Sequence, residues 1–98
     1  MEILSLPVEF EWDKYNTEKI ETKHKINPAE CEEVFFNMLL MLMPDIKHSR
    51  AEARYQALGK TNTKRLLFIV FTVRNRKIRV ITARGASRKE RRMYNEAA

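Results

Sequence analysis

The segment Leu66–Val73 constrains the fold more than any other part of the chain, because its sequence LLFIVFTV is apolar at both odd and even positions. A strand that shows one face to water alternates apolar and polar residues, whereas a strand covered on both faces is a nearly continuous apolar run. We therefore expect Leu66–Val73 to be a strand in the middle of a sheet, with other parts of the chain packed against both faces.

A hairpin is expected directly after this strand. Arg74-Asn75-Arg76 has the polar composition of a turn, and Lys77–Ala83 then alternates as a half-buried strand does. The alternation predicts two faces, with Ile78, Val80 and Thr82 on one and Lys77, Arg79, Ile81 and Ala83 on the other. Arg79 would then project from a surface that is otherwise small and apolar.

Further strands are expected on the N-terminal side. The hexapeptide VEFEWD, Val8–Asp13, alternates apolar with acidic residues, as a half-buried strand does. Arg54–Leu58 is a short strand candidate that ends at Gly59, and Pro44–Ala51 before it has the composition of a loop. Leu39–Met43 is either the end of a helix or the beginning of one more strand, and the sequence leaves both possibilities open.

Three helices are indicated by their start signals. Asp13 can cap a polar helix over Lys14–Lys25, and Asn27–Glu30 (NPAE) combines a cap residue, a proline at the first position and a glutamate at the third. The S-x-x-E sequence that starts at Ser87 has the form of a capping box and predicts a final helix to about Ala97.

These elements give the order βααβββα, with or without one extra strand near residue 40. We expect an α+β fold with a small antiparallel sheet, two N-terminal helices and one C-terminal helix. The 98 residues are 44% apolar and include only two glycines and three prolines, which suits one small packed domain over residues 1–98.

The sequence also bears on where the protein works. The longest apolar run, Met38–Met43, is far too short to cross a bilayer, and Met1–Pro7 lacks the basic and apolar regions of a secretion signal. Cys31 is the one cysteine, so no internal disulfide can form, as is usual in a reducing cytosol. We expect a cytoplasmic protein that is not attached to a membrane.

Charge is distributed very unevenly along the chain. The net charge is +6, but residues 1–59 carry 7 Lys and Arg against 11 Asp and Glu, whereas residues 60–98 carry 12 against 2. A net of −4 followed by a net of +10 indicates a basic face that meets a polyanion, either nucleic acid or an acidic protein. The charge limits the class of partner and indicates no particular chemistry.

Several kinds of catalytic site are not supported by the sequence. His24, His48 and Cys31 lie far apart, and none of them has the spacing of metal ligands on one helix face. Asp45 and His48 have a D-x-x-H spacing, which is a very weak signal on its own. Cys31 lies between acidic residues, where thiolate formation is disfavoured, and the two glycines are too isolated for a phosphate-binding loop. We expect neither a metal nor a cofactor.

Arginines remain as candidate functional residues. Arg79 and Arg84 have apolar strand neighbours, and a rigid guanidinium fork at such positions suits bidentate contact with phosphate better than solubility alone. The final helix places four basic residues on one arc of roughly 160°, at about 100° per residue: Arg88, Lys89, Arg91 and Arg92. For any one of these four, a solvated surface is the commoner explanation, since exposed charges are the default.

Motifs along nearly the whole chain, from about Val8 to Tyr94, resemble the BrnT family of bacterial toxins. The matching segments are VEFEWD at Val8–Asp13, KH at Lys23-His24, VFF at Val34–Phe36, HSRAEAR at His48–Arg54, IRVITAR at Ile78–Arg84 and E-R-R-x-Y at Glu90–Tyr94. The pairing of FEWD near the start with IRVITAR and E-x-x-x-Y near the end is fairly specific. Lys25 stands where the family usually has a glycine, so the turn after the first helix is a place where this chain could differ.

The resemblance implies a small ribonuclease with a RelE-like fold, the toxin half of a type II toxin–antitoxin pair. Such a toxin cuts RNA without a metal and so inhibits translation and growth. It is silenced by a ribbon-helix-helix antitoxin, similar to BrnA, that also binds operator DNA. Toxin and antitoxin are expected to form a heterotetramer.

The resemblance also implies roles for individual residues. Arg79 and Arg84 would be the active-site arginines, and Tyr94, His48 and Arg54 would complete the catalytic set. Contacts with RNA are expected from His24, Lys77, Arg88, Lys89, Arg91 and Arg92. From the residues alone, Tyr94 equally fits an aromatic that docks the final helix, and each histidine is more often an ordinary surface residue.

Two other functions are compatible with the same sequence. A nucleic-acid-binding module without catalysis would use the same basic face and would bind with a strong salt dependence. A protein-interaction domain would use this face only to meet an acidic partner. Without the resemblance, ribonuclease activity and simple nucleic-acid binding are almost equally supported.

Overall fold

Helices and strands alternate irregularly along residues 9–98, which are the residues that the computed structural model describes. The elements are β1 (Glu9–Glu11), α1 (Lys14–His24), α2 (Pro28–Phe36), β2 (Met41–Pro44), the short 3₁₀ helix η1 (Ile46–His48), β3 (Tyr55–Lys60), β4 (Leu66–Arg74), β5 (Lys77–Gly85) and α3 (Arg88–Ala97). The α+β class and all three predicted helices are confirmed, and the undecided segment near residue 40 is a strand. The expected strand residue Val8 and the segment Met1–Pro7 lie outside the described residues.

The strands form one five-stranded sheet in the order β1-β5-β4-β3-β2, so β4 lies in the middle as its apolar run predicted. The pairs β2–β3, β3–β4 and β4–β5 are antiparallel, but β1 pairs with β5 in parallel. The sheet is therefore mixed: three of its four strand pairs are antiparallel, as expected, and the β1–β5 pair is the exception. The alternation of apolar residues in a strand fixes which side chains are buried, but it carries no information about strand direction.

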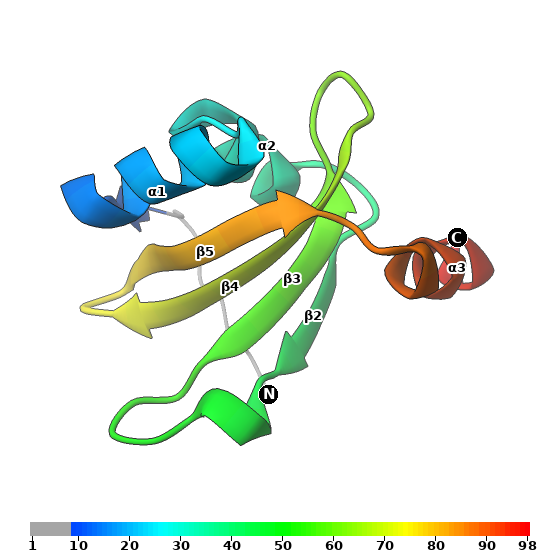
Figure 1. The fold of residues 1–98 in the computed structure, drawn as a ribbon. Helices are drawn as coiled ribbons and strands as arrows, with labels where there is room; N and C mark the ends of the chain where they lie inside the picture. The colour runs from blue at the N-terminus through cyan, green and yellow to red at the C-terminus, as the bar shows by residue number, and fades with distance from the viewer. Residues whose placement is uncertain (1–8) are drawn as a thin grey trace.

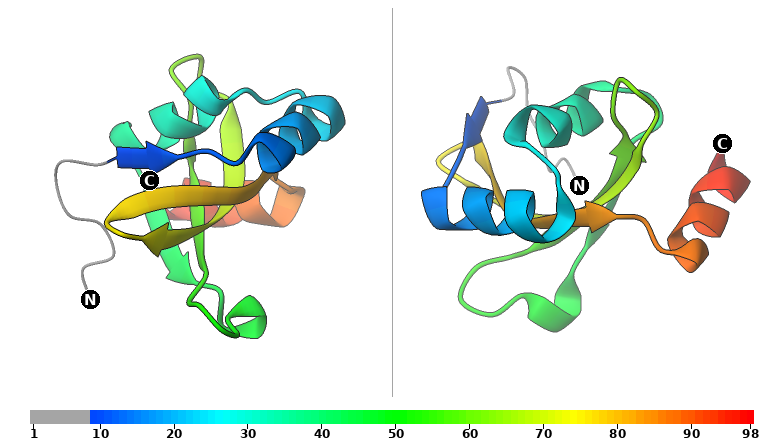
Figure 2. Two further views of the ribbon diagram at one scale, coloured as in Figure 1. Left: turned by 90° about the vertical axis from the view of Figure 1, so that its left-hand side faces the viewer. Right: turned by 45° about the horizontal axis from the view of Figure 1, so that its top comes forward.

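Helices α1 and α2 pack side by side over one face of the sheet, which we call the helix-covered face (Figures 1 and 2). Ile20 of α1 and Val34 and Phe35 of α2 join the buried strand residues there in one hydrophobic core. The ring of Phe35 meets that of Phe71 edge to face, with centroids 5.1 Å apart. Full burial of each such side chain contributes about 1.5–3 kcal/mol, so this core accounts for the position of both helices.

The ends of α1 and α2 are capped as the sequence predicted. The side chain of Asp13 accepts from the Asn16 amide at 3.1 Å, and Asn27 and Glu30 form a reciprocal capping box. At the other end of α1, Lys25 has φ 54°, in the left-handed region that favours glycine. Lysine at this position therefore keeps a glycine-like turn.

One extra residue in β5 changes which of its side chains share a face. Thr82 lies opposite Val70, but the next pair along the sheet is Val80 with Phe71. Ile81 consequently has no partner of its own and forms a β-bulge, which bends the strand and shifts the alternation by one residue.

The bulge corrects the predicted faces of β5. Ala83 is fully buried in the core of the helix-covered face and does not share a face with Arg79. Arg79 lies opposite Thr72 and Arg84 opposite Phe68, and these two β4 residues are four positions apart on one face of a regular strand. Both arginines therefore lie on the face away from α1 and α2.

This second face, called the open face below, is only partly covered. The strand residues whose side chains lie on this face include Gln56, Leu58, Phe68, Val70, Thr72, Arg79, Thr82 and Arg84. Helix α3 lies beyond the end of β5, apart from the other two helices (Figures 1 and 2), and its Tyr94 packs with Leu58 and Leu66 in a small cluster. The rest of the open face is where a ligand can approach. Among the described helices, none is long and apolar enough to cross a membrane.

Candidate active site

A pocket of about 370 Å³, called the site pocket below, opens on the open face next to the loop between β2 and β3. Its lining comes from strands β3, β4 and β5 and from the segment between β2 and β3. The lining residues are Asp45, His48, Arg54, Gln56, Phe68, Val70, Ile81, Thr82 and Arg84. Three of the five predicted catalytic residues, His48, Arg54 and Arg84, thus lie together in one pocket.

The loop that carries His48 is held in place by its own hydrogen bonds. The Asp45 amide donates to the Arg54 carbonyl at 2.8 Å, which closes the loop at its base. The Ser49 hydroxyl donates to the Asp45 carbonyl at 2.8 Å and accepts from the Arg54 amide at 2.9 Å. These contacts fix the short helix η1, and with it the direction of the His48 side chain.

His48 is oriented by a buried carboxylate. Its Nδ1 lies 3.1 Å from each carboxylate oxygen of Asp45, whose side chain is 5% exposed, whereas the His48 side chain is 59% exposed. A carboxylate can only accept, so Nδ1 carries the proton in this contact. In the neutral ring, Nε2 is then the acceptor, and it has no hydrogen-bond partner within residues 9–98. The weak D-x-x-H spacing thus marks a real contact.

Arg84 is fixed by contacts with Glu90, Phe68 and the Gly85 carbonyl, to which its Nη1 donates at 3.1 Å. Its Nη1 and Nη2 donate to the two carboxylate oxygens of Glu90 at 2.9 Å each, and its guanidinium stacks 4.3 Å from the centre of the Phe68 ring. The hydrogen bond from Arg84 to Glu90 is the main cause that raises the pKa of Arg84. The guanidinium is therefore permanently charged and held in one plane at the edge of the site pocket.

Glu90 was expected only as a capping residue, and it has a second role here. Its carboxylate completes the capping box of α3 by accepting from the Ser87 amide at 2.7 Å, while it also holds Arg84. Burial alone would raise the pKa of Glu90, but the hydrogen bonds from Arg84 and Ser87 lower it to a net value below the usual range. One carboxylate therefore links the start of α3 to the site pocket.

Arg54 completes the basic rim of the site pocket. Within residues 9–98 its guanidinium has no hydrogen-bond or ion-pair partner, although its backbone closes the loop. The pocket therefore holds two guanidinium groups and a histidine, with Asp45 as its one carboxylate, and that carboxylate is occupied by His48. Such a rim suits a phosphate, which accepts several charge-assisted hydrogen bonds at once.

Arg79 does not line the site pocket, although it shares the open face. Its Nη1 donates to Glu11 at 2.9 Å and its Nη2 to Asp13 at 3.0 Å, and its side chain is 23% exposed. These contacts connect β5 to the edge strand β1 and to the cap of α1. In this structure Arg79 holds two carboxylates, and its catalytic role stays a prediction.

Tyr94 also lies outside the site pocket. It is 3% exposed, and its hydroxyl donates to the Leu39 carbonyl at 2.8 Å. The ammonium group of Lys60 lies 5.7 Å from its ring centre. Tyr94 therefore docks α3 onto the segment before β2, which is one of the two roles expected from the sequence. Its part in catalysis stays a prediction.

The predicted RNA-binding residues fall in three separate places. His24 lies at the end of α1, on the opposite side of the sheet from the site pocket, and its carbonyl accepts from Arg65 at 3.1 Å. Lys77 starts β5, eight residues or about 26 Å from the other end of that strand. The four basic residues of α3 are all exposed and lie nearest to Arg84 in sequence: Arg88, Lys89, Arg91 and Arg92.

Other chemistries find little support in the described part of the chain. Residues 9–98 contain no group of three or more His, Cys, Asp or Glu side chains that could hold a metal ion. Cys31 is fully buried, and its burial, followed by the charges of Glu30 and Glu32, raises the pKa of the thiol to about 12. A thiol with this pKa is not a nucleophile near neutral pH.

The fold and the site pocket define a small basic α+β protein in which two arginines and a histidine line one pocket. A sequence profile described as ribonuclease toxin, BrnT, of type II toxin-antitoxin system matches residues 12–90. The chain belongs to this family. The expected resemblance is therefore confirmed over most of the chain.

Comparison with solved structures supports the fold. The crystal structure of the Brucella abortus ribonuclease toxin, BrnT, is similar, with a TM-score of 0.62 and 23% sequence identity. The match covers 83% of this chain and 99% of the Brucella chain. A search among curated proteins gives no significant match.

Proposed function

We propose that this protein is a metal-independent endoribonuclease toxin, which cleaves RNA to inhibit translation and growth and is neutralised by a cognate antitoxin. The observation that carries the proposal is the meeting of His48, Arg54 and Arg84 in one pocket of a BrnT-family chain. A histidine that shares one pocket with two guanidinium groups can supply both the proton transfer and the charge stabilisation of RNA cleavage without a metal. Residues 1–98 form the single toxin domain in this proposal.

The reaction needs three things at one phosphodiester: removal of the 2′-hydroxyl proton, stabilisation of the pentavalent phosphate, and a proton for the departing 5′-oxygen. Nε2 of His48 takes the 2′-hydroxyl proton, and the 2′-oxygen then attacks phosphorus. The bond from phosphorus to the 5′-oxygen breaks, and a proton from the imidazolium or from water completes the 5′-hydroxyl. The products are a 2′,3′-cyclic phosphate and a 5′-hydroxyl end.

Arg54 and Arg84 stabilise the charge that develops on the phosphate in this scheme. A preorganised donor aimed at such charge contributes about 3–4 kcal/mol. Arg84 is preorganised by Glu90 and Phe68, and Arg54 is free to turn towards the substrate. Asp45 keeps His48 in the tautomer that the scheme needs. The exposed basic face of α3 attracts RNA to the pocket by its charge.

The partner proposed is a ribbon-helix-helix antitoxin, similar to BrnA, that assembles with the toxin as a heterotetramer and carries it to operator DNA. The description of the family as part of a type II system supports a protein antitoxin. Both partners act in the cytoplasm in this proposal, since RNA and operator DNA are found there.

A cleavage assay in EDTA tests the proposal. Purified protein is incubated with unstructured RNA, and wild type is compared with His48→Ala, Arg84→Ala and the control Lys19→Ala, which removes an exposed charge on α1. Cleavage by wild type and the control, with losses of about 100-fold or more in the other two variants, supports the proposal. Binding without cleavage would instead identify a nucleic-acid-binding module, and cleavage only with added metal would exclude the mechanism.

A further inference from the structure

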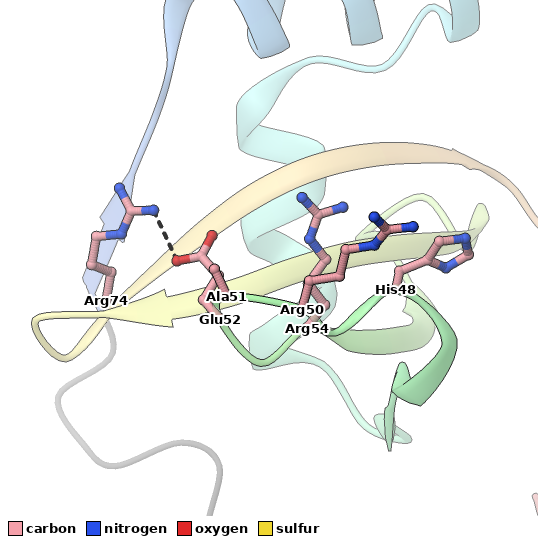
Figure 3. Close-up of a pocket in the computed structure, with 6 residues that line it drawn as sticks. All are labelled: His48, Arg50, Ala51, Glu52, Arg54 and Arg74. Carbon is pink, nitrogen blue, oxygen red and sulfur yellow. Dashed lines mark hydrogen bonds and ion pairs between the residues drawn. The ribbon is translucent and has the colours of Figure 1, made fainter.

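A second cavity of about 470 Å³, called the flanking cavity here, shares lining residues with the site pocket. Figure 3 shows the residues that line it. It is lined by His48, Arg50, Ala51, Glu52, Arg54 and Arg74. Because His48 and Arg54 line both cavities, the two share a wall made of proposed catalytic side chains. A molecule that fills one cavity therefore lies next to whatever fills the other.

The residues that line the flanking cavity carry a net positive charge. They include three arginines and one carboxylate, a difference of two positive charges. Arg74 donates to Glu52 at 2.8 Å, and this hydrogen bond is the main cause that lowers the pKa of Glu52, so the carboxylate stays ionised. Arg74 uses one of its five N–H donors in this contact. Arg50 is exposed and has no hydrogen-bond or ion-pair partner within residues 9–98.

The two cavities follow the open face of β4. Phe68 and Val70 line the site pocket, and Arg74, further along the same strand, lines the flanking cavity. Between them, the hydroxyl of Thr72 donates to the Ala53 carbonyl at 2.8 Å, which holds the loop against the strand. Six residues of strand span about 20 Å. A nucleotide adds about 3.4 Å of stacked strand, so the surface is longer than one nucleotide.

We propose that the flanking cavity binds a second phosphate of the same RNA strand whose scissile phosphate lies in the site pocket. The inference rests on the proposed function and adds the substrate class, which is single-stranded RNA that spans both cavities. A basic groove that tracks the backbone is how proteins bind single strands without reading their sequence. Figure 3 shows Arg74 at one end of this surface and His48 at the other, with Glu52, Arg50 and Arg54 between them. The three arginines are therefore spread along the surface, as contact with successive phosphates requires.

A charge-deletion scan tests the flanking cavity. RNA oligonucleotides carry 2′-O-methyl groups, so that no attack is possible, and one phosphate at a time is replaced by a neutral methylphosphonate. Binding of each oligonucleotide is measured for wild type, Arg50→Ala, Arg74→Ala and Lys19→Ala. Arg50 and Lys19 are both exposed, so these two variants differ in the position of the deleted charge and not in burial. Cleavage of unmodified RNA in EDTA is measured in parallel.

The expected result is coupling between one phosphate and the two flanking arginines. Wild type and Lys19→Ala should lose about five- to twentyfold in affinity when a phosphate beside the scissile position is neutral. Arg50→Ala and Arg74→Ala should bind unmodified RNA more weakly than wild type by a similar factor. In these two variants, replacing the same phosphate by a methylphosphonate should cause almost no further loss of affinity. The slope of log affinity against log salt should flatten by about 0.7 in Arg50→Ala and in Arg74→Ala, and should not change in Lys19→Ala.

The outcomes separate this inference from the proposed function. Two results would overturn the proposed phosphate site without affecting the proposed ribonuclease activity. One is an equal loss of affinity in wild type and in Arg50→Ala when that phosphate is neutral, and the other is wild-type affinity for RNA in both arginine variants. Coupling between that phosphate and the two arginines, with no cleavage of unmodified RNA, would support the phosphate site and contradict the proposed ribonuclease activity. Failure of wild type to bind any of the oligonucleotides would overturn the inference directly.

Discussion

Replacing Glu90 tests how the Arg84 guanidinium is held at the site pocket. Glu90 accepts from both terminal nitrogens of Arg84 at 2.9 Å and from the Ser87 amide at 2.7 Å. Glu90→Gln keeps a side chain that can complete a capping box but removes the charge that Arg84 contacts. Glu90→Ala removes both, so the two variants separate the ion pair from the helix cap.

The expected magnitudes follow from the exposure of the pair. The side chain of Arg84 is 39% exposed and that of Glu90 is 16% exposed, so the pair is only partly shielded from water. Hydrogen bonds to charged groups contribute about 1.5–3 kcal/mol when shielded, and exposed ion pairs about 0–1 kcal/mol. We expect Glu90→Gln to lower the free energy of unfolding by about 1 kcal/mol. Glu90→Ala should lose about 1 kcal/mol more with the cap, and each such loss lowers Tm by about 4–8 °C.

The lowered pKa of Glu90 gives this effect a pH dependence with a definite sign. A carboxylate whose pKa is lower in the folded state stabilises the fold above its unfolded pKa, and the contribution is lost as pH falls through the folded pKa. Urea denaturation should therefore separate wild type from Glu90→Gln at about pH 7 and show a much smaller difference at about pH 3. Equal stability of the two proteins at neutral pH, or a difference that grows on acidification, would refute the reasoning.

Three further predictions concern other residues. The Cys31 thiol, with a pKa near 12 instead of 9.0, should react with a disulfide reagent about 1000-fold more slowly than an exposed cysteine until urea unfolds the chain. Asp45→Asn should lower the rate of RNA cleavage by about 100-fold with little change in RNA affinity, because the asparagine amide can donate to Nδ1 of His48 and so favour the other tautomer. Unchanged cleavage would remove Asp45 from the mechanism. Arg79→Ala should lower the free energy of unfolding by about 1–2 kcal/mol, because two carboxylates lose their partner. A thermal melt of Arg79→Ala that matches wild type would contradict this structural role.

Local signals made most of the fold predictable. The apolar run in β4 placed that strand in the middle of the sheet, and the capping residues Asp13, Asn27 and Ser87 located the helix starts. Two features depend on contacts between distant segments and are absent from any local pattern. The first is the parallel pairing of β1 with β5. The second is the bulge at Ile81, where β5 has one residue more than the paired stretch of β4.

The site was predictable only in part for the same reason. His48 and Arg54 lie in one short motif, and the loop hydrogen bonds bring them together with Arg84. The sequence gives no sign that β1 pairs with β5, so it could not show that Glu11 lies opposite Arg79 and occupies its guanidinium. The second contact of Glu90 was hidden because the capping box alone explains a glutamate at that position.

The end groups of RNA cut in EDTA test the central claim most directly. Mass spectrometry of the products distinguishes the two chemistries, because attack by the 2′-hydroxyl leaves a 2′,3′-cyclic phosphate and a 5′-hydroxyl. We predict these ends from wild type, and no cleavage where the nucleotide at the scissile phosphate lacks its 2′-hydroxyl. Products that carry 5′-phosphate ends, or cleavage of the 2′-deoxy substrate, would contradict a mechanism built on His48, Arg54 and Arg84.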